Sequence, residues 1–351
     1  MRGTFVLPAP IRIPMGGAAV VYRHAEALAA RGHRVSIVSP RRTLPGWRGA
    51  AMEAAVRVRD WAHRVAPAEY YAAPGVRSLV VPRVEARHLP EADVVVATGV
   101  QTARSVAALP DAAGAKLYFI QGDETFADPS ARETWHLPMR RVTCATWLAD
   151  AVRQSGETVD AVVPNAVDPD DFGVDVPIEG RPPSVVALYH RHPVKGPDVL
   201  IEALERIREA LPDVPVRLFS ARPPSHALPD GVEVHVRPDD LRVLYNRSAV
   251  LLHPSRSEGW PLVPMEAAAC GCAVVGCANP GVQEYLEPGV SMRAVPVGDG
   301  RALGEAALEV LADDALRQRL ATAAKDVVTR YSWSASTDVL EAALASIGGP
   351  S

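Results

Sequence analysis

Residues 253–278 read HPSRSEGWPLVPMEAAACGCAVVGCA, and two short apolar runs frame this segment. The runs are VLLH at 250–253 and AVVG at 273–276. Short continuous apolar runs are typical of strands that are covered on both faces of a sheet. A helix that begins near Leu262 fits between them, because Pro264 is acceptable in a first turn. The segment therefore predicts a strand–turn–helix–strand unit of a parallel sheet.

Two glutamates stand eight positions apart in this segment, at Glu258 and Glu266. Glu258 precedes Gly259 in the predicted turn, where a short backbone can approach a ligand closely. Glu266 falls within the first two turns of the helix, whose free N–H groups suit hydroxyl or phosphate oxygens. On spacing alone, one helix-capping acid and one acid of an amphipathic helix is the simpler interpretation.

The same alternation of apolar runs and helical patterns continues along the rest of the chain, and it predicts an α/β fold. Residues 168–184 interrupt it with four prolines, two glycines and five acidic residues, which is typical of a linker. We therefore expect two Rossmann-like, doubly wound parallel-sheet domains that face a cleft, at 1–171 and 184–330, joined by a linker at 172–183. The other predicted strands are 4–7, 35–38, 94–97, 117–120, 141–144, 185–188 and 216–219, and the other predicted helices are 18–31, 198–211 and 302–330.

The composition of the chain excludes several classes of protein. The chain has 351 residues, 48% of them hydrophobic, and a mean hydropathy of +0.02, so it is neither disordered nor collagen-like. No apolar run reaches the roughly 18 residues that suggest a membrane span. The first thirty residues hold no signal-peptide core, and we expect a cytoplasmic protein. Four cysteines are too few for a disulfide scaffold.

The charge pattern argues against a nucleic-acid partner. Residues 1–168 carry 20 basic and 16 acidic side chains, whereas residues 169–351 carry 17 and 25. Neither half shows a dense Lys/Arg stripe interleaved with aromatic residues. The basic residues are 34 Arg and only 3 Lys, a bias that codon usage in a GC-rich bacterial genome explains best.

The sequence SRSEGWPLVPMEAAACG, at 255–271, resembles the E-x7-E motif of retaining glycosyltransferases with the GT-B fold, especially glycosyltransferase family 4, the glycosyl transferases group 1. The motif of that family reads S-x-x-E-G-F-G/P-L-x-x-x-E-A-x-A-C-G. Trp260 stands at its aromatic position, and Pro261 stands in its glycine-or-proline slot. Because Pro261 has no N–H to donate, sugar contacts from this loop must use neighbouring amides.

A second segment, YHRHPVKGPDVLIEAL, resembles G-R-x-x-x-x-K-G-x-x-x-L-I-E-A of the same family. The resemblance places Arg191 and Lys195 at its phosphate-binding positions. Two fixed cations can stabilise the charge that develops on a leaving diphosphate without a metal ion. The alternative interpretation is an exposed loop with unpaired charge, and the helix start at Gly196 favours the functional one.

Weaker matches extend the resemblance over nearly the whole chain. Gly16 and Gly17 open the first helix like the glycine pair that lies near the donor phosphate and the acceptor in this family. The final helix, within 331–351, is expected to pack back onto the N-terminal domain. Many relatives carry a histidine after the fifth strand, where this chain has Gln121 followed by Asp123. Asp123 is equally well interpreted as orienting an acceptor hydroxyl or as capping a turn.

The resemblance implies a role for each matched residue. Glu258, Arg191 and Lys195 are expected to form the catalytic set, with Arg191 and Lys195 on the diphosphate and Glu258 on the sugar hydroxyls. Glu266 is expected to hold the ribose hydroxyls of a nucleotide-diphosphate sugar. The other expected donor-binding residues are Gly259, Trp260, Leu262, Arg237, Gly16 and Gly17, with the backbone at 236–238 near the base. Gln121 and Asp123 are expected to face the acceptor.

The resemblance further implies transfer to an acceptor hydroxyl with retention of the anomeric configuration, no cofactor and no metal ion. A polysaccharide, a glycolipid or a natural product is the expected acceptor. Two alternatives stay open, an epimerase-like enzyme acting on sugar nucleotides and a non-catalytic sugar-nucleotide-binding partner protein. Asp168 and Asp170 imitate a D-x-D metal site, but they fall where acidic turn residues are expected.

The segment 47–65, WRGAAMEAAVRVRDWAHRV, is amphipathic and rich in arginine. An ordinary packed helix or a lid over the acceptor site is its simpler interpretation. The alternative is a helix that lies on an anionic membrane and admits a lipid-linked acceptor, which would place the protein at the inner face of the membrane.

Overall fold

The computed structural model describes residues 1–41 and 70–348. The amphipathic segment at 47–65 therefore lies outside the described residues. The chain divides into two compact units, and each contains one parallel sheet. The first unit comprises Met1–Val142, Val152–Ala161 and Thr337–Ser351, and the second comprises Thr143–Ala151 and Val162–Ser336. These units describe spatial clustering, and the domain limits at 171, 184 and 330 stay a prediction.

The sheet of the first unit has the order β3-β2-β1-β4-β5-β6-β7 among the described residues. The interior strand β1 pairs in parallel with β2 on one side and β4 on the other, so that Phe5 lies beside both Ile37 and Val96. This order is that of a doubly wound sheet. The strands are β1 (Arg2–Val6), β2 (Arg34–Pro40), β3 (Arg77–Val81), β4 (Val94–Ala97), β5 (Ala115–Ile120), β6 (Arg140–Thr143) and β7 (Ala161–Val162).

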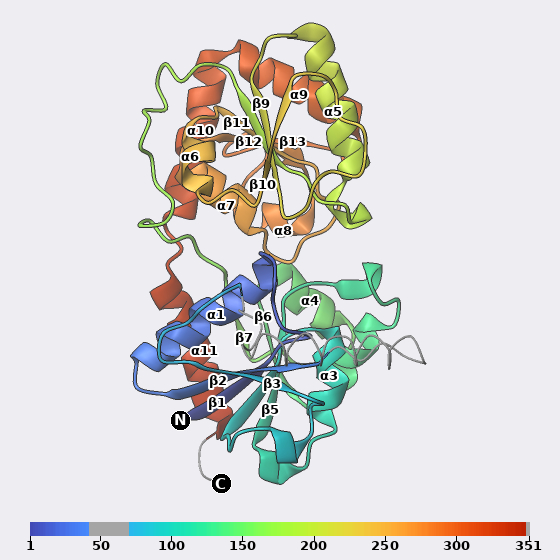
Figure 1. The fold of residues 1–351 in the computed structure, drawn as a ribbon, viewed down its shortest axis with the longest axis vertical. Coiled ribbons are helices and arrows are strands. Elements are labelled where there is room, and N and C mark those ends of the chain that lie inside the picture. Colours follow the sequence, from blue (N-terminus) through green and yellow to red (C-terminus); the bar gives the residue numbers. More distant parts are fainter. Residues whose placement is uncertain (42–69, 349–351) are drawn as a thin grey trace, which may run out of the picture. The chain divides into compact units, whose positions relative to one another are not determined.

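The helices of the first unit lie on both faces of its sheet (Figure 1). The final helix, α11, contacts α1 through His24, whose Nδ1 lies 3.0 Å from Oγ1 of Thr337, and through an ion pair between Arg31 and Glu341. The helices are α1 (Gly16–Ala30), α3 (Val100–Ala107), α4 (Thr146–Gln154) and α11 (Trp333–Gly348), with 3-10 turns η1 (Ala86–His88), η2 (Asp111–Ala113), η3 (Glu124–Phe126) and η4 (Ala131–His136). Residues 146–151 of α4 and 333–336 of α11 cluster with the second unit.

The sheet of the second unit repeats the same winding, with the order β10-β9-β8-β11-β12-β13. Every recorded pairing in it is parallel, and Leu251 of β11 lies between Val186 of β8 and Val274 of β12. The predicted pair of doubly wound sheets is therefore confirmed. The strands are β8 (Val185–Leu188), β9 (Val216–Ser220), β10 (Val232–Val236), β11 (Val250–His253), β12 (Ala273–Cys277) and β13 (Arg293–Val295).

The helices of the second unit also cover both faces of their sheet (Figure 1). The stretch predicted as helical at 302–330 is helical and forms two helices, because the chain breaks at Asp313, whose side chain accepts from the amide of Leu316 and starts a new helix. The helices are η5 (Pro193–Lys195), α5 (Pro197–Ala210), α6 (Leu241–Asn246), α7 (Leu262–Ala269), α8 (Pro280–Gln283), α9 (Gly300–Ala312) and α10 (Asp314–Val328). None of the described helices in either unit is long and apolar enough to cross a membrane.

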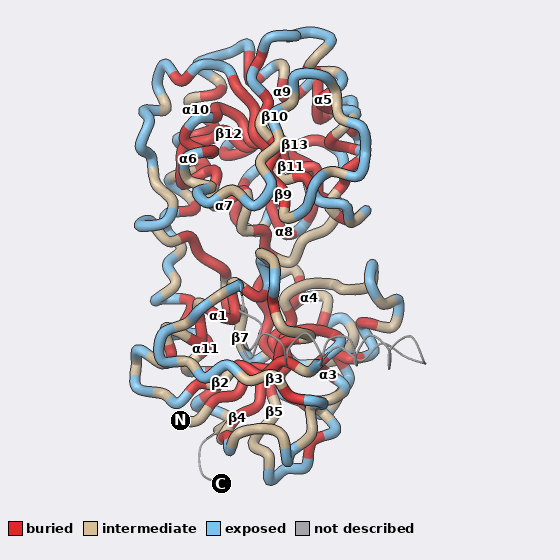
Figure 2. Tube along the Cα trace, viewed as in Figure 1, coloured by how far each residue is buried: buried red, intermediate tan, exposed pale blue. Residues whose placement is uncertain are grey.

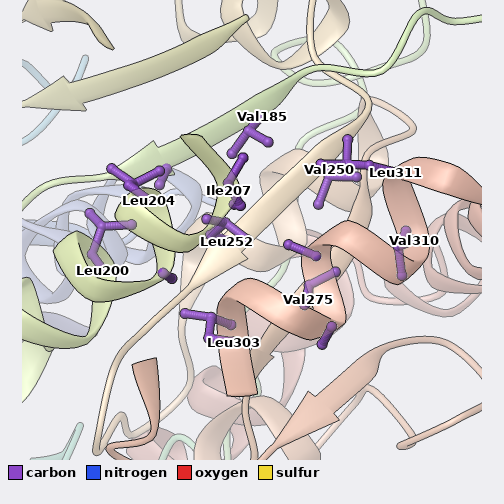
Figure 3. Packing of buried hydrophobic residues seen from close by; sticks show 14 of the residues in the cluster. Val185, Leu200, Leu204, Ile207, Val250, Leu252, Val275, Leu303, Val310 and Leu311 are labelled. Atoms are coloured by element: carbon purple, nitrogen blue, oxygen red, sulfur yellow. The ribbon is translucent and has the colours of Figure 1, made fainter. Parts of the chain in front are cut away.

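The core of the second unit lies between its sheet and the helices α5 and α9. Figure 2 shows that buried residues follow the strands, whereas exposed residues follow the loops. Figure 3 shows how strand side chains such as Leu252 and Val275 meet Leu204 of α5 and Leu303 of α9. This packed core fixes the ends of the strands, and the loops that leave those ends carry the polar residues described next.

Candidate functional site

Two polar loops of the second unit leave the neighbouring strands β8 and β11, at the point where the sheet reverses its order. The loop after β8 leads through α5 to β9, whereas the loop after β11 leads through α7 to β12, and β9 and β12 lie on opposite sides of the β8–β11 pair. At such a switch point the two loops diverge and leave a crevice at the carboxyl ends of the strands, which is where open α/β sheets bind ligands. Lys195 lies on the first loop and Glu258 on the second.

Lys195 and Glu258 form an ion pair across this switch point. The ammonium Nζ of Lys195 lies 2.6 Å from each carboxylate oxygen of Glu258. The Glu258 side chain is only 14% exposed, and burial by itself would raise its pKa, but the charge of Lys195 and the hydrogen bonds from Lys195 and Ser255 outweigh burial and leave that pKa lowered. Glu258 is therefore a carboxylate at neutral pH, and the sequence-predicted pair is brought together.

Gly196 allows the two loops to approach each other. Its φ of 64° is the left-handed region that favours glycine, and a Cβ there would lie 2.3 Å from the carbonyl oxygen of Pro254. The loops are also linked by the amide of Arg256, which donates to the carbonyl of Val194 at 2.8 Å. The glycine that follows Lys195 is thus needed to hold the lysine beside Glu258.

A third loop, after β12, supports the backbone of Glu258. A Cβ on Gly281 would lie 2.3 Å from the carbonyl oxygen of Glu258, so only glycine fits there. The side chain of Asn279 donates through Nδ2 to the carbonyl of Ser255 at 3.0 Å and accepts from the amide of Val282 at 3.1 Å. These contacts from the loop after β12 hold the backbone of the Glu258 loop in place.

Glu266 lies in the second turn of α7, as predicted, and is buried beside Tyr245. The Tyr245 hydroxyl donates to Oε2 of Glu266 at 3.0 Å. Burial raises the pKa of Glu266 to about 7, and the hydrogen bond from Tyr245 opposes this only in part. Glu266 therefore changes its charge near neutral pH, unlike Glu258.

Arg191 is the one proposed catalytic residue that does not join this cluster. Its side chain is exposed, and its guanidinium donates through Nε and Nη2 to the carbonyl of Pro223, at 3.2 and 2.5 Å. The family motif has four residues between its arginine and its lysine, but only three separate Arg191 from Lys195. The position that matches the motif arginine by counting back from Lys195 is His190.

The other residues of the second unit that are expected to bind the sugar donor lie on three different segments of the chain. Gly259 follows Glu258, and its carbonyl accepts from the indole N–H of Trp147 at 2.9 Å, within the same unit. Leu262 opens α7, whose N-cap Pro261 provides no side-chain cap. Arg237 lies just after β10 with a φ of 51°, and its Nε donates to the carbonyl of Ala221 at 3.1 Å.

Trp260 is part of a packed aromatic cluster. Its ring stacks on Tyr285 at 5.2 Å between centroids and meets Tyr331 edge-on at 5.1 Å. Its indole N–H lies 3.0 Å from the sulfur of Met265. The side chain is only 6% exposed, so Trp260 supports the loop, and a donor contact from this position would come from its backbone.

In the first unit, the residues predicted near the acceptor form a separate group. A Cβ on Gly17 would lie 3.4 Å from Oε1 of Gln121, so these two positions are neighbours, and Gly16 starts α1 beside them. Asp123 accepts from the amide of Thr125 and pairs with Arg132 at 2.6 Å. Of the two interpretations of Asp123, these contacts match the turn cap.

Three residues of the site escaped the sequence analysis, namely Tyr245, Asn279 and Gly281. Tyr245 lies in a helix whose sequence carries no chemical signal. Asn279 and Gly281 occur in ANPG, where an Asn-Pro step before a glycine is a turn signal that could have indicated a tight loop. Among residues 1–41 and 70–348, no group of three or more His, Cys, Asp or Glu side chains is placed to hold a metal ion.

Comparison with known sequences finds a family match within the second unit. A family model described as Glycosyl transferases group 1 matches residues 184–313. D-inositol 3-phosphate glycosyltransferase of Xylanimonas cellulosilytica is 32% identical over 212 residues, 52% of this chain and 51% of that protein. Phosphatidyl-myo-inositol mannosyltransferase of Mycobacterium leprae is 32% identical over 190 residues, half of each protein. The chain thus spans about half the length of these curated relatives.

Comparison with solved structures shows the fold. Sucrose-phosphate synthase from Thermosynechococcus elongatus matches with a TM-score of 0.74 at 17% identity, over 97% of this chain and 98% of that one. HepE from Anabaena, solved in complex with UDP-glucose, matches with a TM-score of 0.72 at 16% identity, over 99% and 100%. These matches confirm the GT-B fold of two Rossmann-like domains.

Proposed function

Residues 184–313 match the family model of the glycosyl transferases group 1, and from this match we propose that the chain transfers a sugar from a nucleotide-diphosphate sugar to an acceptor hydroxyl, with retention of the anomeric configuration. The observation that carries the proposal is the ion pair between Lys195 and Glu258 at the switch point of the second sheet. It holds one cation and one carboxylate within a few ångströms of each other at the crevice where this fold class binds ligands. Glu266, in the second turn of α7, adds a second carboxyl group in the same unit.

Each group matches a different part of the donor. Lys195 neutralises the charge that develops on the diphosphate as the bond between phosphate oxygen and anomeric carbon breaks. Glu258 accepts hydrogen bonds from sugar hydroxyls, and Glu266 accepts them from the ribose hydroxyls. The acceptor hydroxyl attacks the anomeric carbon from the side of the leaving group, and its proton passes to the leaving phosphate oxygen. The scheme uses no protein nucleophile and no metal ion.

The relatives suggest donor and acceptor classes. HepE binds UDP-glucose, which supports a uridine-diphosphate sugar as the first donor to try. The relatives named for inositol phosphate and for phosphatidyl-inositol support an acceptor with a ring hydroxyl, free or on a lipid. We keep polysaccharides and natural products in the proposed acceptor class, since the residues expected near the acceptor, Gly16, Gly17 and Gln121, lie outside the family match at 184–313. A lipid-linked acceptor would bring the protein to the inner membrane face.

The function is tested by incubating the chain with a panel of nucleotide-diphosphate sugars and measuring nucleotide release. We expect one donor to release its nucleotide, and we expect this release to be faster when an acceptor is added. A metal chelator should not change the rate of release. NMR of the product should show that the anomeric configuration is retained. Loss of activity on chelation would disprove metal independence alone. Neither binding nor release with any donor would disprove the transferase proposal.

The ionisation of Glu266 predicts how donor affinity depends on pH. A carboxyl group with a pKa of about 7 is mostly ionised at pH 8 and about 90% protonated at pH 6. Since the ionised form accepts both ribose hydroxyls, the affinity for UDP-glucose is expected to fall about tenfold from pH 8 to pH 6. Calorimetric titration measures this, and the intact donor is used because its diphosphate has no terminal phosphate group that titrates in this range.

Glu266→Gln is the matched control for this pH dependence. The amide keeps the size of the side chain and has no proton to exchange near pH 7, so its affinity is expected to be the same at both pH values. An equally steep pH dependence in Glu266→Gln would assign the titration to another group and contradict the prediction.

A further inference from the structure

The loop after β8 contains two histidines whose rings are fixed by backbone amides. The amide of His192 donates to Nδ1 of His190 at 3.1 Å, and the amide of Val194 donates to Nδ1 of His192 at 3.3 Å. The two rings lie 6.5 Å apart between centroids. Each histidine thus uses its inner ring nitrogen to close a turn of the loop that ends at Lys195.

These hydrogen bonds decide where the proton of each neutral ring lies. A nitrogen that accepts an amide hydrogen bond carries no proton of its own, so the proton of each neutral imidazole is on Nε2. If Nδ1 were protonated, its N–H would face the N–H of the backbone amide, and the hydrogen bond that closes the turn would be lost. The fold therefore keeps each ring as an Nε2–H donor.

The surroundings of His190 keep it neutral at pH 7. Enough protein surrounds its ring for desolvation to lower its pKa, and the positive charges of Lys195 and Arg222 lower it further, as does His192. The carboxylate of Glu258 acts in the opposite direction and is outweighed. His190 is nevertheless exposed to solvent, so a ligand beside Lys195 can reach it.

The side chain of Arg191, by contrast, already makes hydrogen bonds to a backbone carbonyl. Two of its guanidinium nitrogens donate to the carbonyl of Pro223, on the segment between β9 and β10. Using Arg191 on a phosphate would require breaking both hydrogen bonds. His190 needs no rearrangement, because its inner nitrogen holds the loop and its Nε2–H remains a donor.

We propose that His190 donates an Nε2–H hydrogen bond to the diphosphate of the sugar donor, next to Lys195, in the role that the sequence assigned to Arg191. This inference rests on the proposed function, since it names a further residue for the same donor. A neutral imidazole and one ammonium then share the diphosphate, in place of two cations.

Two variants separate the binding role of His190 from its role in the loop. In His190→Asn, the side-chain oxygen can still accept the amide of His192, but the outer N–H donor is lost. In His190→Gln, the terminal amide can replace the Nε2–H donor, but the inner acceptor is lost. His136→Asn, on an exposed histidine of the first unit that pairs with Glu157, is the matched control.

The probes are UDP-glucose, uridine monophosphate and inorganic pyrophosphate, which carries the diphosphate without base or sugar. Binding is measured by calorimetric titration at pH 7.5. We expect His190→Asn to weaken binding of UDP-glucose and pyrophosphate about tenfold or more, the effect of one hydrogen bond to a charged group. Uridine monophosphate should change less, His190→Gln should retain most of the affinity, and His136→Asn should equal the unsubstituted chain.

Each other outcome overturns the inference in a recognisable way. Affinity that falls in His190→Gln but not in His190→Asn would show that the histidine only closes the loop. If both variants bind UDP-glucose and pyrophosphate as tightly as the unsubstituted chain, His190 has no role in binding, and the proposed function stays intact. If the unsubstituted chain binds neither pyrophosphate nor any nucleotide-diphosphate sugar, the proposed function fails, and this inference fails with it.

Discussion

Replacing Lys195 by methionine is expected to lower kcat/KM by about 10²- to 10³-fold, the usual effect of removing one group that stabilises charge in a transition state. Methionine keeps the length and the apolar stem of the side chain but has no charge. The leaving diphosphate then loses its ammonium partner. Glu258 loses the cation that opposes its burial, so its pKa is expected to rise. Steady-state kinetics with the donor found in the panel measure the effect.

The chain offers a matched control, because it has only three lysines. Lys325 lies on α10 of the same unit, and its ammonium is 3.8 Å from Asp326. Lys325→Met makes the same chemical change outside the site, and its turnover is expected to equal that of the unsubstituted chain. Both variants should keep the circular-dichroism spectrum of the folded protein. Turnover of Lys195→Met within a fewfold of the control would refute the diphosphate role of Lys195.

The predicted strands show which parts of the fold can be derived from sequence. The nine predicted strands are all interior strands of the two sheets, and several bounds match, as at Val94–Ala97, Val185–Leu188 and Val250–His253. The four missed strands, β3, β7, β10 and β13, are the four sheet edges. An interior strand is covered on both faces and reads as a continuous apolar run. Edge strands lack this signal, as VEVHV of β10 illustrates.

The residues of the candidate site also divide into those that the sequence could predict and those that only the structure shows. Glu258, Glu266 and Lys195 are predicted from their resemblance to family motifs, and the structure places all three in the second unit, while their roles stay a prediction. The choice of Arg191 depended on a motif that is one residue shorter here, and only its hydrogen bonds to Pro223 show where the side chain lies. Tyr245 could not be predicted, because its contact with Glu266 joins two helices that are distant in sequence.

Gly281→Ala is expected to have the second-largest effect, although it adds only one methyl group. The φ of Gly281 is not in the left-handed region, so alanine is tolerated by its backbone conformation and fails only for lack of space. Its Cβ would lie 2.3 Å from the carbonyl oxygen of Glu258 and 3.0 Å from the Cβ of that residue. The Glu258 loop must move, and overpacking of this kind costs about 1–3 kcal/mol of stability.

The displacement of Glu258 is expected to affect catalysis more than stability. A shift of about 1 Å in a positioning group can lower turnover about 10²-fold, so we expect a loss of that order in kcat/KM. Thermal unfolding measures the stability, and steady-state kinetics with the same donor measure the loss of activity. Gly3→Ala is the control, because Gly3 also has an ordinary φ and a Cβ there would meet nothing within 4 Å. Normal kinetics in Gly281→Ala would mean that the loop absorbs the methyl group without moving the carboxylate, and that the contact between α8 and Glu258 does not position it.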